Sequence, residues 1–177
     1  MRVVGMVFAG VSLLAVPPSS AWAATSATMS VSAQIVAGCA VNGAVPTSGA
    51  SVGALGTLDF GSAASLSTAS LQATLSPFAT VALTCTPGVQ VTMTVDGGLH
   101  YAGGSRGMVL SGGTARVAYA LFSDSTYGAA IQPGAAVSVD VTGSPKPLTL
   151  PVFGRAALTG LSPAGLYSDT LTVTLQW

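Results

Sequence analysis

Two-residue alternation between apolar and polar side chains is the feature that most constrains how this chain folds. It is cleanest in the last seven residues, where every second side chain is apolar and the others are Thr or Gln; the apolar positions are Leu171, Val173, Leu175 and Trp177. Because successive side chains of a strand point to opposite faces, this spacing predicts a C-terminal strand whose apolar face packs on the core. Similar runs occur at residues 81–85, 89–95, 117–121 and 137–141, whereas helical spacing is nearly absent.

Turn-forming residues separate these runs. Asn42-Gly43, Asp96-Gly97-Gly98 and Pro133-Gly134 are examples, and such clusters recur about every ten residues. Short strands with this punctuation are typical of a β-sandwich or barrel, so the sequence predicts a single all-β domain. Residues 47–76 are rich in Ser, Ala and Gly and poorly periodic, and we predict long loops there around a short strand at 58–60.

The N-terminus has the features of an export signal. Arg2 precedes an uncharged apolar run over residues 3–16, and Ala21-Trp22-Ala23 forms a small-residue cleavage site. A retained anchor helix is the alternative, but Pro17-Pro18 would end that helix too early to span a bilayer. We therefore predict that residues 1–23 are a signal peptide and that the mature, exported chain begins at Ala24.

Charge is scarce and balanced. The chain has five Lys and Arg residues against five Asp and Glu, and removal of Arg2 leaves four against five, a net charge of about −1. Such a surface lacks the basic stripe that phosphate backbones require, so no nucleic-acid partner is expected.

The chain contains two cysteines, Cys39 and Cys85. An even pair in an exported protein favours a disulfide. Two buried free thiols are the alternative, and a metal pair is less favoured because no second Cys or His lies close by in the sequence.

Candidate catalytic residues are few. His100 is the only histidine, and with Asp96 it could form half of a metal site or part of a triad. A single His in a glycine-rich loop is more typical of a solvated hairpin, and no nucleophile-elbow or zinc-protease motif occurs. The sequence therefore predicts no enzyme activity, no cofactor and no metal.

A second alternating segment precedes the first cysteine. Its apolar positions share one face of an extended chain and are separated by Thr, Ser and Gln; they are Ala27, Met29, Val31, Ala33 and Ile35. One interpretation is an ordinary strand of the chain's own sheet. The other is a donor strand that leaves its own domain and fills a groove in a neighbouring molecule.

Several short motifs, taken together, resemble the spore coat protein U domain family, which includes Csu-type subunits of archaic chaperone–usher pili. They run in family order over the mature chain: Leu58-Asp59-Phe60-Gly61, residues 81–86, 95–98 and 106–108, 119–124, Pro151-Val152-Phe153-Gly154-Arg155, and 165–175.

The resemblance implies an incomplete immunoglobulin-like β-sandwich that is completed by a donor strand from a neighbouring subunit. Residues 24–36 would be the donor segment, with the five apolar positions named above as its inserted face, and residues 37–177 would be the sandwich. Cys39 and Cys85 match the family's disulfide, and Tyr167 matches a tyrosine corner, in which the hydroxyl bonds to the upstream backbone.

The implied function is that of a structural subunit of a pilus, which supports adhesion and biofilm formation. The implied partners are neighbouring pilus subunits, a periplasmic chaperone and an outer-membrane usher. The alternative is a secreted or spore-coat surface protein, or an adhesin domain, that does not polymerise.

Overall fold

The computed structural model describes residues 26–77, 82–142, 146–147 and 149–177. The predicted signal peptide, residues 1–23, lies outside them. The chain divides into two units, Met1–Ile35 and Val36–Trp177. All regular elements of the described residues are β-strands, which confirms the all-β prediction. No helix in this part of the chain has the length and apolar character needed to cross a membrane.

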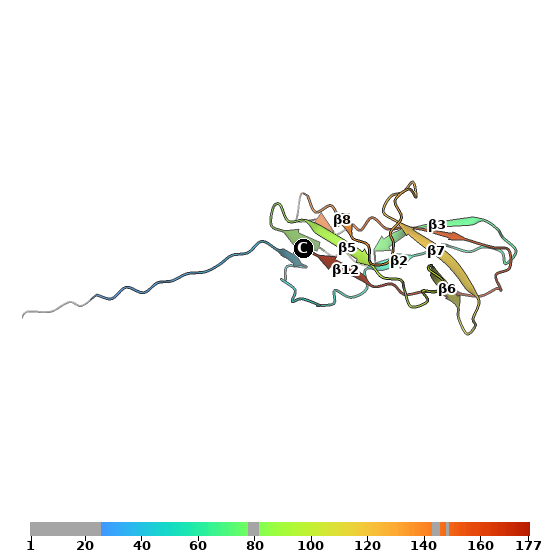
Figure 1. The fold of residues 1–177 in the computed structure, drawn as a ribbon, viewed down its shortest axis with the longest axis horizontal. Coiled ribbons are helices and arrows are strands. Elements are labelled where there is room, and N and C mark those ends of the chain that lie inside the picture. Colours follow the sequence, from blue (N-terminus) through green and yellow to red (C-terminus); the bar gives the residue numbers. More distant parts are fainter. Residues whose placement is uncertain (1–25, 78–81, 143–145, 148) are drawn as a thin grey trace, which may run out of the picture. The chain divides into compact units, whose positions relative to one another are not determined.

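The described residues of the second unit form three antiparallel sheets. Figure 1 shows β5, β8 and β12 together, apart from β3, β6 and β7. The largest has the order β11 (Tyr167–Ser168), β6 (Arg106–Leu110), β7 (Arg116–Phe122), β10 (Phe153–Ala157), β3 (Ser70–Pro77) and β2 (Gly56–Leu58). The second has the order β12 (Val173–Gln176), β5 (Val91–Val95) and β8 (Val137–Val139). The third has the order β1 (Cys39–Val41), β4 (Ala82–Cys85) and β9 (Lys146–Pro147).

The core forms between the sheets from the alternating faces that the sequence displays. Val91, Met93 and Val95 of β5 are at most 1% exposed, and they share one cluster with the inward side chains of β7, which are Val117, Tyr119 and Leu121. Since β5 and β7 belong to different sheets, one apolar core joins the two sheets in a sandwich. The strands expected within 89–95, 117–121 and 137–141 are thus present.

The prediction for residues 47–76 is correct for the loops but misses a strand. Residues 47–55 and 59–69 form no strand, and the short strand expected at 58–60 is instead β2, which ends at Leu58. The missed element is the eight-residue strand β3, which begins at Ser70. The inward positions of β3 are Leu71, Ala73 and Leu75, separated by Gln and Thr. A small alanine at the centre weakens the alternation, and the strand is held by the distant strand β10 on one side and by β2 on the other.

Two local predictions are confirmed. Cys39 and Cys85 form a disulfide between β1 and β4, where they lie directly opposite each other. With a sequence separation of 46 residues, this bond stabilises the fold by about 4 kcal/mol on the chain-entropy account. The Tyr167 hydroxyl donates to the Pro163 carbonyl at 2.8 Å, as a tyrosine corner requires.

Candidate binding groove

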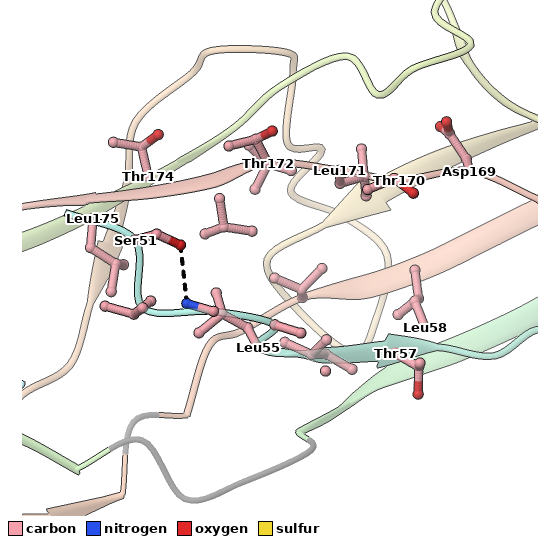
Figure 2. A pocket seen from close by; sticks show the side chains of 18 of the residues that line it. Ser51, Leu55, Thr57, Leu58, Asp169, Thr170, Leu171, Thr172, Thr174 and Leu175 are labelled. Carbon is pink, nitrogen blue, oxygen red and sulfur yellow. Dashed lines mark hydrogen bonds between the residues drawn. The ribbon is translucent and has the colours of Figure 1, made fainter. Parts of the chain in front are cut away.

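A groove of about 1340 Å³ lies within the second unit, between the C-terminal strand and the connection that precedes β2. Residues 46–58 form one wall and residues 167–177 the other. The lining also includes core side chains, among them Val95, Tyr119 and Val152. Figure 2 shows the two walls running side by side, with Leu175 directed into the space between them and Thr172 and Thr174 directed to the opposite side.

The C-terminal wall presents an open strand edge. Within the described residues β12 pairs only with β5, so β12 is an edge of its sheet. The Asp96 N–H donates to the Thr172 carbonyl at 3.0 Å, so the backbone of Thr172 faces β5. Because bonded and non-bonded positions alternate along an antiparallel pair, the backbone groups of Val173 and Leu175 face away from β5. Their N–H and C=O groups are therefore positioned to bind an added strand.

The apolar side chains of the C-terminal wall are partly buried and can also be contacted from the groove. Leu171, Val173 and Leu175 pack against the core cluster but remain partly exposed, and all three line the groove. Trp177 departs from the predicted core face, because its side chain is 44% exposed. It follows the last residue of β12 and lies beside Gly38, where a Cβ would be 3.9 Å from the indole Nε1. Trp177 therefore lines the groove just after β12 instead of filling the core.

The opposite wall is irregular as far as β2. Residues 45–55 form no strand, and Val52 is 38% exposed. Two local hydrogen bonds shape this segment: the Ala50 N–H donates to the Thr47 carbonyl, and the Gly53 N–H donates to Ser51 Oγ (Figure 2 draws the second). The groove is thus bordered by one regular edge strand and by an irregular segment that leads into β2.

A polar cluster holds the other end of the C-terminal strand. The Asp169 side chain is 4% exposed, and its Oδ2 accepts from the Tyr119 hydroxyl at 2.7 Å. Its Oδ1 lies 3.0 Å from His100 Nδ1 and accepts from the His100 backbone N–H at 3.2 Å. Burial, with the hydrogen bond to Asp169, raises the pKa of Tyr119, so this hydroxyl stays protonated and donates.

Arg106 lies beside this cluster and is only 4% exposed. Its guanidinium donates to the carbonyls of Ile131 at 2.6 Å, Asp96 at 2.8 Å and Val95 at 3.1 Å. Burial lowers the pKa of Arg106, while the nearby carboxylates and tyrosines oppose that shift. The buried cation is therefore satisfied by backbone carbonyls, and it fixes the end of β5 against which the last strand begins.

The sequence singled out Asp96 with His100, but the structure pairs His100 with Asp169. Asp96 instead accepts from the backbone N–H groups of Gly98 and Thr172. Sequence reasoning missed Asp169 because it lies 69 residues from His100, and no local pattern marks such a contact. No group of three or more His, Cys, Asp or Glu residues in the described part of the chain could hold a metal ion.

The N-terminal unit is described over residues 26–35, which form no strand. All five positions of the predicted inserted face are exposed in this segment: Ala27, Met29, Val31, Ala33 and Ile35. The exposed fractions are 84% for Met29, 83% for Val31 and 95% for Ile35. Burial of a large apolar side chain stabilises a protein by roughly 1.5–3 kcal/mol, and side chains left in water do not gain this stabilisation.

Comparison with known proteins places the sequence in context. The Spore Coat Protein U domain matches residues 25–174. No curated protein matches the chain. Among solved structures, the chaperone–tip adhesion subunit pre-assembly complex CsuC–CsuE, from archaic chaperone-usher Csu pili of Acinetobacter baumannii, matches with 17% identity and a TM-score of 0.39. That match covers 81% of this chain and 40% of the other.

Proposed function

The chain belongs to the Spore Coat Protein U domain family, and from this premise we propose that it is a structural subunit of a surface pilus assembled by donor-strand exchange. The groove beside β12 would accept the N-terminal segment of a neighbouring subunit. The observation that carries this proposal is the open edge of β12, whose outward backbone groups at Val173 and Leu175 border an apolar groove.

The N-terminal segment has the chemistry that such a groove requires. An extended segment that pairs with β12 would add backbone hydrogen bonds along the edge and direct every second side chain into the groove. Met29, Val31 and Ile35 would each contribute roughly 1.5–3 kcal/mol on burial, and the smaller Ala27 and Ala33 would contribute less. The Thr, Ser and Gln residues between them would face solvent.

The proposal gives each part of the chain a role. Residues 1–23 direct export and are removed, residues 24–36 are donated, and residues 37–177 form the acceptor sandwich. A periplasmic chaperone would cover the groove during transit, and an outer-membrane usher would exchange the chaperone for the next subunit. The fibre would then support adhesion and biofilm formation at the cell surface.

Val31→Asp tests the proposal, with Ser32→Asp as the matched control on the opposite face of the same segment. A charge at the centre of the inserted face cannot be buried without a partner, so Val31→Asp should abolish SDS-resistant ladders. Ser32→Asp should retain them, because its carboxylate stays in water. Both variants should yield soluble, chaperone-bound monomer at the level of the unmodified chain.

Two other outcomes contradict strand donation. If Val31→Asp lowers the yield and thermal stability of the monomer, the segment is a strand of its own sheet. If the unmodified chain forms no ladder with a matching chaperone and usher, it is a surface or spore-coat protein that does not polymerise.

A further inference from the structure

The outer face of the largest sheet carries a cation whose charge no carboxylate of the described residues neutralises. The alternation of β10 turns Gly154 and Ala156 to the core and Arg155 to the opposite side. In the described part of the chain the Arg155 guanidinium makes no hydrogen bond or ion pair, and it is held by two aromatic rings. Its central carbon lies 4.4 Å from the centre of the Tyr127 ring and 5.5 Å from that of Phe122. Stacking of this kind fixes a guanidinium and leaves its N–H donors available for a ligand.

The turn after β7 holds the Tyr127 ring in place. Tyr127 has a φ of 59°, in the left-handed region that a bulky side chain rarely adopts. The Asp124 carboxylate fixes this turn by accepting three backbone N–H bonds, from Thr126 at 2.8 Å, Gly128 at 3.1 Å and Ala129 at 2.6 Å. A left-handed conformation persists where the surrounding bonds enforce it, and such positions cluster at ligand clamps and other functional sites. The ring, and with it the guanidinium, is therefore preorganised.

Small and uncharged side chains lie beside the guanidinium on the same face. In the sheet, Arg155 is directly opposite Ala120 of β7 and Gln72 of β3. On the same side of β10, Phe153 is opposite Thr74 of β3. Gln72, Thr74 and Ala120 are all exposed. The positions next to Arg155 thus provide an amide, a hydroxyl and aromatic surface, without a second cation.

These groups have the chemistry of a site for an acidic sugar. A guanidinium binds one carboxylate through two parallel N–H bonds, and a uronic acid carries one carboxylate on each ring. The hydroxyl groups of a sugar can bond to amide and hydroxyl side chains, and the C–H groups of its ring can pack on aromatic side chains. Nucleic acid is a poorer match, because a phosphate backbone is bound by several clustered cations.

We propose that the outer face of the large sheet around Arg155 binds acidic polysaccharide, with the guanidinium paired to the carboxylate of one uronate ring. This site is separate from the groove, whose lining includes Leu75 and Tyr119 from the inward faces of β3 and β7. The proposal therefore goes beyond strand donation and does not depend on it. In a polymer, one weak site on every subunit would bind a long polysaccharide with high avidity.

Titration of the purified mature chain with a hexamer of galacturonic acid, followed by ¹H–¹⁵N NMR, tests the proposal. The largest amide shifts should occur in β7 and β10 around Arg155. Arg155→Gln should weaken binding about tenfold, and Arg155→Lys should weaken it less, because it keeps the charge but loses the paired N–H bonds. Lys146→Gln is the matched control: it removes the same charge from β9, in another sheet, and should bind like the unmodified chain.

A second variant does not depend on the stability of the first. Tyr127→Asn removes the ring that holds the guanidinium, and asparagine tolerates the left-handed conformation, so this variant should fold. It should bind the hexamer several-fold more weakly than the unmodified chain, because the guanidinium is no longer fixed. The same NMR spectra report whether each variant is folded.

The remaining outcomes overturn the proposal. Absence of shifts with the galacturonate hexamer, or equal affinity for a neutral glucose hexamer, shows that no acidic sugar is recognised. Unchanged affinity in both Arg155→Gln and Tyr127→Asn places the binding elsewhere. Equal affinity for a hexaglutamate peptide shows a general carboxylate site and overturns the assignment to polysaccharide. Because the titration uses the monomer, its result is independent of whether SDS-resistant ladders form.

Discussion

Replacing the buried carboxylate at the far end of the groove measures how firmly the C-terminal strand is held. Asp169→Asn preserves shape but removes the charge and one of two acceptor oxygens. In the structure these oxygens serve the Tyr119 hydroxyl at 2.7 Å and the two nitrogens of His100 at 3.0 and 3.2 Å. The amide oxygen can still accept from one side of this set, so the change weakens one charge-assisted interaction.

A hydrogen bond to a charged group contributes about 1.5–3 kcal/mol, so the free energy of unfolding should fall by about that amount. For a domain of about 150 residues this corresponds to a melting temperature lower by roughly 3–12 °C. Asp169 is almost fully buried, so solvent screening reduces the free energy of its hydrogen bonds only slightly.

Thermal and urea unfolding of the purified mature chain, followed by far-UV circular dichroism at pH 7, give the measurement. Asp59→Asn is the matched control, because Asp59 is exposed and its carboxylate accepts a local bond from the Gly61 N–H. Asp59→Asn should change stability by less than about 1 kcal/mol. If Asp169→Asn is as stable as this control, the cluster does not anchor the strand and the reasoning fails.

Two further changes test other parts of the fold. Val173→Asp places a charge against the core at a cost of several kcal/mol, so this variant should yield little folded protein. Thr174→Asp, on the opposite face of β12, should fold. Equal periplasmic yields of the two variants would refute this strand orientation. Hydrogen bonds from Thr126, Gly128 and Ala129 lower the pKa of Asp124 to about 2, so its contribution should be present above pH 4 and lost as the pH falls through 2. Asp124→Asn should remove that part of the acid dependence in a pH series of thermal melts, and identical acid profiles would contradict it.

Strands with strong two-residue alternation could be predicted from the sequence, because their side chains report the environment directly. β5 buries Val91, Met93 and Val95 and leaves Thr92 and Thr94 less buried, so each residue type matches its face. β7 follows the same rule. In both strands local pattern and tertiary burial agree, and this agreement makes the prediction secure.

Strands whose inner positions are small or unusual could not be predicted in this way. β10 turns Gly154 and Ala156 inward. Position 154 requires glycine, because a Cβ there would lie only 2.6 Å from the Leu58 side chain and 2.7 Å from the Phe60 side chain. β6 turns the charged Arg106 inward, which no hydrophobic pattern anticipates. These strands are specified by partners distant in the sequence.

The groove likewise combines features that the local sequence predicts with features that depend on distant contacts. The alternation of the C-terminal strand predicted its apolar face, but the polar cluster at its far end depends on contacts across 50 and 69 residues of chain. Nor does the sequence show that, in the part of the chain that the structure describes, β12 pairs with β5 alone, because an edge strand and a central strand can share one pattern when one face is buried.

An open strand edge beside an apolar groove makes the unassembled subunit prone to misassociation. Unpaired backbone groups on an edge strand bind other extended chains readily, and natural proteins usually cover such edges. Here β12 combines a free edge with the partly exposed Leu171, Val173 and Leu175, so an empty groove is a site for misassociation. The exposed N-terminal segment of the same chain carries a matching apolar face. A partner that occupies the groove before assembly is therefore a physical requirement of the proposed mechanism, and that partner must bind less tightly than the five-position face that replaces it.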